Sequence, residues 1–115
     1  ITGAAAARGL GAAQAELFAA HGARMILSDI DDEAGHARAQ AIIDRGGSAE
    51  YLHLDVSQEA DWRVAMAAIE RQHGRLDVLS NNAGIFRIED IETTSVEAWN
   101  AVFAVNQTGV FLGMK

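Results

Sequence analysis

Residues 2–11 of the chain are Thr-Gly-Ala-Ala-Ala-Ala-Arg-Gly-Leu-Gly, a glycine- and alanine-rich stretch that directly precedes a helical pattern. Apolar residues from Leu10 to His21 recur at helical spacing, and Gly22 follows as a helix-ending glycine. Such a turn offers free backbone N–H groups at a helix N-terminus, and its glycines let a pyrophosphate approach the backbone. It predicts a strand–turn–helix unit that binds a dinucleotide. The residues assigned to this contact are Gly3, Arg8, Gly9, Leu10 and Gly11.

Beyond this turn, the chain alternates between strand-like and helix-like patterns. The expected strands cover residues 23–28, 50–56 and 76–80, and the expected helices cover residues 31–45 and 57–73. This alternation is typical of parallel βαβ units with right-handed crossovers. We therefore expect an α/β fold with a doubly wound parallel sheet, helices on both faces and the strand order 3-2-1-4. Its first strand is expected to be truncated, because only Ile1 precedes the turn.

Capping residues mark the ends of the later helices. Ser57 is placed to cap the N-terminus of the helix at 57–73, and Gly74 is placed to end it. Thr94 and Glu97 form a capping box for a last helix. The apolar face of that helix includes Trp99, Val102, Phe103, Val110 and Phe111. A face of this kind more often packs on its own sheet than on another protein.

An acidic residue follows the glycine-rich turn at the distance that a dinucleotide site requires. Asp29 comes 18 residues after Gly11, and the fingerprint expects an acid ~20 residues on. Its carboxylate could accept both hydroxyls of the adenosine ribose, and together with Asp31 and Asp32 it would repel a 2′-phosphate. Arg8 acts in the opposite sense, because its guanidinium could pair with the 2′-phosphate of NADP. The balance of charge favours NAD over NADP, and the alternative for Asp29 is a helix-capping or solvated loop acid.

Composition excludes several classes of function. The chain has no cysteine, so disulfides, thiolate zinc sites and cysteine nucleophiles are excluded, and a cytoplasmic protein is expected. The net charge of −7 and scattered basic residues disfavour a nucleic-acid partner. No apolar run approaches the ~20 residues of a membrane span. The four histidines lack metal-binding spacing. Both ends look cut, which predicts a fragment of a longer protein.

With these residues in hand, the chain resembles the short-chain dehydrogenase/reductase family over its whole length. Four features match in order: the turn at residues 2–11, the strand-end acid Asp29, the pair Asp55-Val56, and the Asn-Asn-Ala-Gly motif at residues 81–84. Within the family, the amino-acid sequence is most similar to hydroxysteroid dehydrogenase-like members. The resemblance implies a Rossmann-type fold in which residues 1–115 are the NAD-binding, N-terminal portion of a single-domain enzyme.

The resemblance also implies a role for each matching residue. Asp55 and Val56 would hold the adenine ring, and Asn106 would be the family's catalytic asparagine, which helps to hold a water in a proton relay. The residues lining the cofactor beside the central strand would be Asn82, Ala83 and Gly84. Two simpler alternatives stay open. Asp55 could cap a helix together with Ser57, and Asn82 could be a left-handed turn residue.

One departure from the family lies in the turn itself. The family places three residues between the first two glycines of this motif, whereas five stand between Gly3 and Gly9. Two of the alanines from Ala4 to Ala7 therefore look inserted. If they bulge outward, Arg8 to Gly11 can still bind the pyrophosphate; if they bulge inward, we expect the affinity to fall.

The implied function is NAD-dependent hydride transfer between nicotinamide and a secondary alcohol or ketone. The family's catalytic serine and Tyr-x-x-x-Lys are missing here, since Tyr51 is followed four residues later by Asp55 and the sole lysine is Lys115. We expect them after residue 115. The alternatives are a dinucleotide-binding regulator without catalysis and an inactive truncated fragment. The resemblance further implies a small-molecule alcohol or ketone substrate, no membrane partner and a homotetramer.

Overall fold

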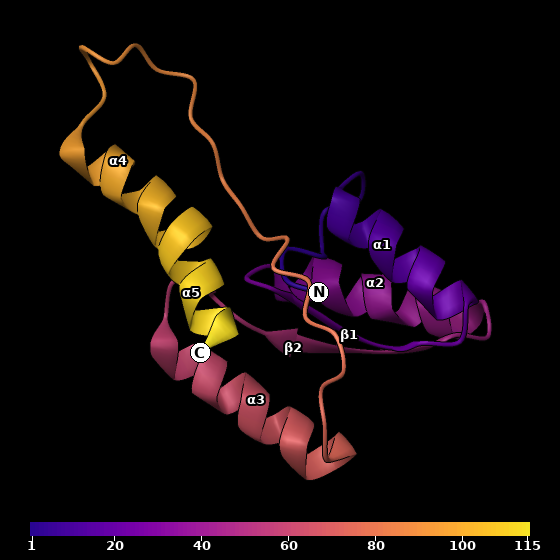
Figure 1. The fold of residues 1–115 in the computed structure, drawn as a ribbon. Coiled ribbons are helices and arrows are strands. Elements are labelled where there is room, and N and C mark those ends of the chain that lie inside the picture. The colour runs from indigo at the N-terminus through magenta and orange to yellow at the C-terminus, as the bar shows by residue number, and fades with distance from the viewer.

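The computed structural model describes residues 1–115 and contains parallel strands with helices on both sides. The elements are α1 (Leu10–Ala20), β1 (Arg24–Asp29), α2 (Asp32–Asp44), β2 (Ser48–His53), α3 (Glu59–His73), α4 (Val96–Phe103), the π-helical turn η1 (Ala104–Thr108) and α5 (Gly109–Met114). β1 and β2 pair in parallel, from Arg24 opposite Ser48 to Asp29 opposite His53. α1 and α2 lie on one face of these strands and α3 on the other (Figure 1). The expected α/β architecture is confirmed.

The sheet is smaller than expected. It contains two strands, β1 and β2, and beyond β1 there is a single parallel bridge between Thr2 and Ser28. The Thr2 N–H then donates to the Ser80 carbonyl at 3.1 Å, so the lateral order is the expected 3-2-1-4. The expected strand at 76–80 is wrong, however, because these residues form no strand. A strand needs a neighbouring backbone along its length, and here Ile1 and Thr2 are the residues that stand beside it.

The third expected strand is displaced toward the N-terminus. We expected it at 50–56, whereas β2 covers Ser48–His53. The partner strand sets this end, because β1 ends at Asp29, which is in register with His53. The Leu54 N–H still donates to the Asp29 carbonyl, after which the two chains separate.

Two of the expected N-caps are wrong by one residue, while Gly74 is confirmed as the residue that ends α3. α3 begins at Glu59 with Gln58 as its N-cap, because the Ser57 hydroxyl donates to the Asp55 carboxylate instead. α4 is capped by Ser95, which accepts the Ala98 N–H at 3.1 Å. The hydroxyl of Thr94 donates to the Asp90 carbonyl and is therefore not part of a capping box. Gly74 ends α3 in the left-handed conformation, with φ of 72°.

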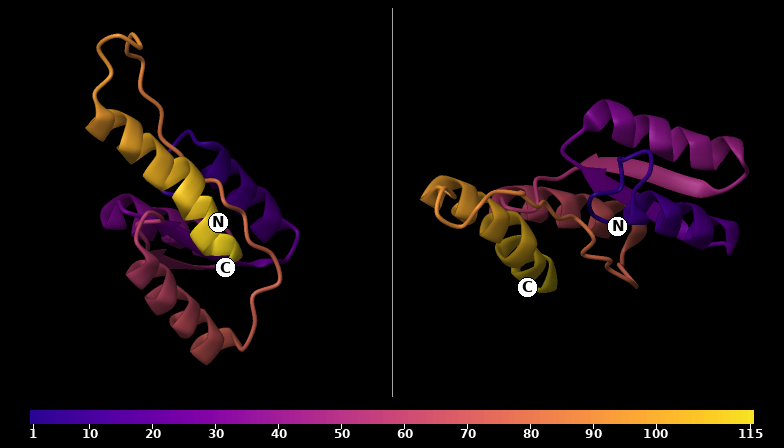
Figure 2. Two further views of the ribbon diagram at one scale, coloured as in Figure 1. Left: turned by 60° about the vertical axis from the view of Figure 1, so that its left-hand side comes forward. Right: turned by 90° about the horizontal axis from the view of Figure 1, so that it is seen from above.

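Two hydrophobic clusters hold the elements together. The larger one lies between the strands and the pair α1–α2, and it centres on the fully buried Leu27. The smaller one contains Leu54, Val56 and Trp62, with Leu112 of α5 packed against it. α5 thus rests on α3, whereas α4 projects away from the strands (Figure 2). None of the helices combines the length and the apolar character needed to cross a membrane.

Candidate dinucleotide site

The start of the glycine-rich turn is fixed against the Asn82 motif. The buried Thr2 hydroxyl accepts the N–H groups of Asn82 and Ala83, at 3.1 and 3.0 Å. The Asn82 side-chain amide donates to the carbonyls of Thr2 and Gly3, at 2.8 and 3.1 Å. Gly3 has φ of 64°, and a Cβ there would lie 2.7 Å from Ala83 Cα. We call this arrangement of Thr2, Gly3, Asn82 and Ala83 the Thr2 corner; it joins two motifs about 80 residues apart.

Gly11 belongs to the same arrangement from the side of α1. A Cβ at this position would lie 2.6 Å from the Asn82 amide nitrogen and 2.7 Å from the Gly3 carbonyl oxygen. The first turn of α1 can therefore approach the Thr2 corner only because residue 11 has no side chain. A glycine at this place in a strand–turn–helix unit allows close packing of the helix against the turn.

The lengthened part of the turn projects outward. Ala4 and Ala5 are buried, with exposed fractions of 0% and 5%, whereas residues 6–8 are exposed. We call residues 6–8 the alanine bulge. It remains close to the next glycine, because a Cβ at Gly9 would lie 3.3 Å from Ala6 Cβ. The bulge therefore projects into solvent while its first residue stays beside Gly9.

The N-terminus of α1 presents unpaired backbone donors. Gly9 is the N-cap and supplies no side-chain cap, and the first helical bond runs from the Ala13 N–H to the Gly9 carbonyl. The N–H groups of Leu10, Gly11 and Ala12 have no partner in the chain. Unpaired donors at the positive end of a helix dipole form a site for an anion such as a pyrophosphate. Leu10 and Arg8 are both exposed beside it.

Asp29 lies at the end of β1, facing the turn. Its Oδ2 accepts the Ala5 N–H at 2.9 Å, and its Oδ1 accepts the N–H groups of Ile30 and Asp31 at 2.8 and 3.3 Å. Asp31, rather than Asp29, caps α2 by accepting the Ala34 N–H. Asp29 is therefore not the helix cap that was its simpler alternative. It connects the lengthened turn to the end of the strand.

The pair Asp55-Val56 follows β2. Asp55 Oδ1 accepts the N–H and the hydroxyl of Ser57, at 2.9 and 2.7 Å, which forms a local turn before α3; the helix cap considered for Asp55 is wrong, because Gln58 is the N-cap of α3. Asp55 Oδ2 takes part in no hydrogen bond, and neither does the Val56 N–H. The Val56 side chain is buried against Trp62, so a ligand at this point would meet the backbone of Val56 and not its side chain.

Asn106 lies in the middle of η1, the π-helical turn that joins α4 to α5. Its Oδ1 accepts the Ile85 N–H at 2.9 Å and its Nδ2 donates to the Ile85 carbonyl at 2.8 Å. Gly84 is close by, because a Cβ there would lie 3.4 Å from Asn106 Oδ1. π-Helical turns occur frequently at functional sites. The side chain of Asn106 thus fastens the segment after the Asn82 motif to this helix.

Sequence reasoning missed the bonds of the Thr2 hydroxyl, the contact with Ile85 and the π-helical conformation around Asn106. The buried hydroxyl of Thr2 had a signal, because it precedes Gly3 at the point where the first strand enters the turn. No pattern pointed to η1 beyond a polar asparagine within an apolar helix. The left-handed turn conformation considered for Asn82 is wrong, since no residue other than glycine has a positive φ.

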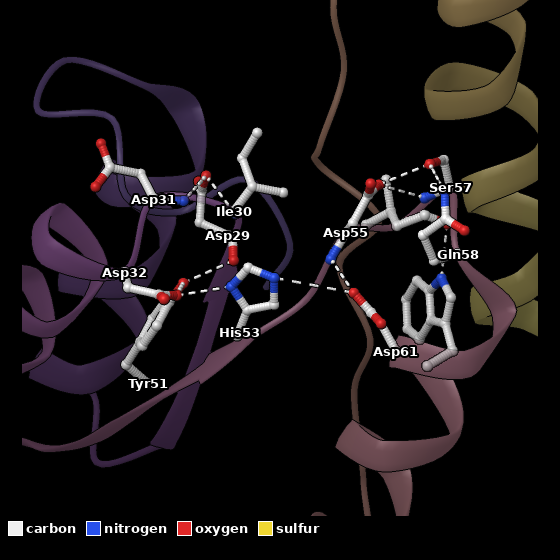
Figure 3. A network of polar contacts seen from close by, with 12 residues as sticks. Asp29, Ile30, Asp31, Asp32, Tyr51, His53, Asp55, Ser57, Gln58 and Asp61 are labelled. Atoms are coloured by element: carbon white, nitrogen blue, oxygen red, sulfur yellow. Dashed lines mark hydrogen bonds and ion pairs between the residues drawn. The ribbon is translucent and has the colours of Figure 1, made fainter.

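A second polar group lies beside Asp29, on α2 and β2 (Figure 3). The Tyr51 hydroxyl lies 2.7 Å from the Asp29 carbonyl oxygen and 2.8 Å from Asp32 Oδ1. His53 Nδ1 lies 2.7 Å from the same Asp32 oxygen. Hydrogen bonds from His53 and Tyr51 lower the pKa of Asp32, and the bond with Asp32 raises the pKa of His53. Burial, followed by the contact with Asp32, raises the pKa of Tyr51.

Comparisons with known proteins point to one family. Residues 3–115 match the family model described as enoyl-(acyl carrier protein) reductase. The chain is 44% identical to 2,5-dichloro-2,5-cyclohexadiene-1,4-diol dehydrogenase of Sphingobium indicum, over 95% of this chain and 44% of that protein. It is 43% identical to 3-alpha-(or 20-beta)-hydroxysteroid dehydrogenase of Mycobacterium tuberculosis, over 95% and 41%.

A solved structure agrees with these relatives. The chain is similar to a metagenomic short-chain oxidoreductase in complex with NADP, with a TM-score of 0.89 and 35% identity, covering 97% of this chain and 50% of that one. The chain spans about half the length of the curated relatives it matches. The hydroxysteroid dehydrogenase among those relatives agrees with the resemblance noted from the sequence.

Proposed function

Because the chain belongs to the short-chain dehydrogenase/reductase family, we propose that it is the cofactor-binding part of an NAD-dependent oxidoreductase acting on a secondary alcohol or ketone. The observation that carries the proposal is the Thr2 corner. It brings the glycine-rich turn, the N-terminus of α1 and the Asn82 motif together at the carboxyl end of β1. Open α/β sheets bind ligands at this end of their strands.

The residues present fit a dinucleotide in three places. The unpaired N–H groups at the start of α1 would receive the pyrophosphate. Asp29 would accept a hydroxyl of the adenosine ribose at Oδ2, which accepts only the Ala5 N–H, whereas its Oδ1 already accepts the N–H groups of Ile30 and Asp31. The free Oδ2 of Asp55 and the free N–H of Val56 supply one acceptor and one donor for the edge of an adenine. Ala83 and Gly84 would line the nicotinamide half.

The preference for NAD over NADP rests on charge. Family membership allows either dinucleotide, and a similar structure contains NADP. Asp29, Asp31 and Asp32 lie together at the end of β1 and the start of α2, where a 2′-phosphate would meet their negative charge. Arg8 on the alanine bulge is the cation nearest in sequence that could offset this repulsion. Three carboxylates against one exposed guanidinium favour the dinucleotide without the extra phosphate.

The reaction needs groups that residues 1–115 supply only in part. A bound nicotinamide would supply the hydride acceptor or donor. Asn106 would take the place of the family's catalytic asparagine, with its side-chain amide bonded to both backbone groups of Ile85. Tyr51 is not the proton donor, because its hydroxyl is bonded beside Asp29 at the adenosine end. We propose that the whole protein supplies the tyrosine and lysine that complete the reaction.

An aromatic surface on α4 bears on assembly. Trp99 is half exposed on α4 and stacks on Phe103 at 4.5 Å, so this helix offers an aromatic surface that a second copy of the chain could cover. A homotetramer is the assembly that the family suggests. The cytoplasmic location rests on the cysteine-free composition.

The test is calorimetric titration of the full chain with NAD and with NADP. We expect NAD to bind more tightly, and we expect Asp29→Asn to weaken NAD binding about tenfold because a charge-assisted bond to the ribose is lost. Asp44→Asn at the far end of α2 is the matched control and should leave both affinities unchanged. Equal affinities for the two dinucleotides in the unaltered protein would contradict the assignment of NAD. Turnover has to be measured in the whole protein that supplies the tyrosine and lysine, and dinucleotide binding there without turnover of any alcohol or ketone would favour a regulator over an enzyme.

A further inference from the structure

His53 occupies a position between two helices that the proposed function does not use. It is the last residue of β2, opposite Asp29 in the register of the strands. Its side chain is 52% exposed and lies between a carboxylate at the start of α2 and another at the start of α3. Nδ1 is 2.7 Å from Asp32 Oδ1, and Nε2 is 3.9 Å from Asp61 Oδ2 (Figure 3).

Each of these carboxylates is bonded to one part of the proposed adenosine site. The Tyr51 hydroxyl shares its one proton between two acceptors, Asp32 Oδ1 and the carbonyl oxygen of Asp29, the proposed ribose acid. Asp61 accepts the backbone N–H of Asp55 at 3.1 Å, and Asp55 is the proposed adenine contact. A chain of contacts therefore runs from Asp29, proposed to bind the ribose, to Asp55, proposed to bind the adenine. The imidazole of His53 lies at its centre.

We infer that His53 is a positioning residue of the adenosine site, which holds the ribose acid Asp29 and the adenine acid Asp55 at a fixed separation by bridging α2 and α3. This inference rests on the proposed function, because it assigns His53 to the site where the dinucleotide would bind. His53 itself touches neither the ribose nor the adenine, and it acts through Asp32 and Asp61.

The bridge depends on the protonation state of the imidazole. A neutral imidazole can donate its one N–H to Asp32 but carries no charge for Asp61, whereas an imidazolium bonds to Asp32 and also attracts Asp61 at 3.9 Å by its charge. The charged groups that face it are Asp32 on α2, Asp61 on α3 and Asp55 after β2, together with the phenol of Tyr51. The hydrogen bond to Asp32 and the charges of these acids raise the pKa of His53, so the bridged form extends toward neutral pH.

The direction of the pH effect follows from this. Because the pKa of His53 is raised in the folded protein, the bridge is complete at low pH and is lost as the pH rises through that raised value. Dinucleotide affinity should therefore weaken with rising pH. Exposed ion pairs contribute little, so we expect a change of about 2- to 5-fold between pH 6 and pH 8.5.

The experiment measures the Kd of NAD for the full chain from pH 6 to pH 8.5. The unaltered protein should show the 2- to 5-fold weakening, while His53→Gln should bind with a pH-independent affinity close to that of the unaltered protein at pH 8.5. Asp61→Asn, which keeps an acceptor for the Asp55 N–H but removes the charge, should also flatten the profile. His21→Gln is the matched control, because His21 ends α1 and bonds to the Leu17 carbonyl; it should keep the full pH dependence.

A second measurement keeps the inference testable if a variant folds poorly. The His53 pKa is followed by NMR in the unaltered protein with and without NAD. Linkage requires that NAD raise this pKa if the protonated form binds more tightly. A His53 pKa that NAD leaves unchanged, or a pH profile that His53→Gln retains, would overturn the inference while leaving the dinucleotide site intact. Failure to bind NAD at any pH would overturn the proposed function and this inference together.

Discussion

The Thr2 corner and the alanine bulge belong to the same turn, yet the chain holds them in opposite ways. At the corner, one hydroxyl and one side-chain amide fasten the backbone of Thr2 and Gly3 to the Asn82 motif through four hydrogen bonds. The alanine bulge at residues 6–8 is exposed and has no polar side-chain contact. Just before it, two bonds tie the turn to β1: the Ala4 N–H donates to the Ser28 carbonyl and the Ala5 N–H donates to the Asp29 carboxylate.

A turn of this kind tolerates extra residues only where its backbone makes few contacts. An insertion at the corner would separate groups that must meet within 3.1 Å, and their buried donors would lose acceptors. An insertion among exposed alanines changes only the length of a solvated loop, whose closure cost grows slowly with length. The two extra residues are therefore found where the chain carries few interactions.

Removing the hydroxyl of Thr2 should have the largest effect on stability. Thr2→Val keeps the shape of the side chain but leaves the N–H groups of Asn82 and Ala83 without their acceptor. We expect the free energy of unfolding to fall by about 2 kcal/mol, measured by urea denaturation. Thr2→Ser is the matched variant and should lose less than half as much. If valine and serine cost the same, the hydroxyl does not hold the corner.

Truncating Asn82 should have the second largest effect on stability. Asn82→Ala leaves the carbonyls of Thr2 and Gly3 without the side-chain donor, and we expect a loss of about 1–2 kcal/mol together with weaker NAD binding. Asn81→Ala is the control, because the side chain of Asn81 makes no hydrogen bond in the structure. A larger loss for the Asn81 variant would show that the corner has been assigned to the wrong asparagine.

Releasing Ile85 from η1 should cost less. In Asn106→Ala both polar groups of the Ile85 backbone lose their partner, but they are exposed and water can replace it. We expect a loss of unfolding free energy below about 1 kcal/mol, with faster amide hydrogen exchange confined to residues 83–86. The neighbouring exposed Gln107→Ala should leave exchange in that segment unchanged. Uniform exchange changes throughout the chain would argue against a local role.

Shortening the bulge should have the smallest effect. Deleting Ala6 and Ala7 restores three residues between Gly3 and Gly9. We expect the unfolding free energy to change by less than about 0.6 kcal/mol, because loop closure depends weakly on length. NAD affinity should be unchanged or tighter, since Ala6 no longer lies beside Gly9. A large loss of affinity would mean that the lengthened turn itself contacts the cofactor and that the alanine bulge is part of the binding site.

The sequence predicted the elements whose signals are local and missed those that depend on partners. The helix starting at Leu10 and the glycine end of α3 were predicted correctly, because helical spacing and Gly74 act within a few residues. The strand at 76–80 was wrong, because an apolar run forms a strand only beside another strand. The N-caps at Ser57 and Thr94 were wrong, because each hydroxyl bonds to an earlier residue instead.

The motifs of the candidate site were predictable from the sequence, but the hydrogen bonds and ion pairs that connect them were not. Spacing identified Asp29 and the Asn82 motif, and the structure brings both to the glycine-rich turn. The bridge through His53 connects residues of β2, α2 and α3 whose proximity no spacing rule encodes. The bond of Ala5 to Asp29 belongs to this lengthened turn, and the family pattern gave no guide to it.

The central claim is that a dinucleotide binds at the Thr2 corner and the N-terminus of α1. Amide chemical shifts of the full chain, followed during a titration with NAD, test it most directly. The account predicts the largest shifts at Leu10, Gly11 and Ala12, with further shifts at Asp29 and Val56, and little change at the far end of α1 near Ala20. Saturable binding that leaves residues 10–12 unshifted would contradict it.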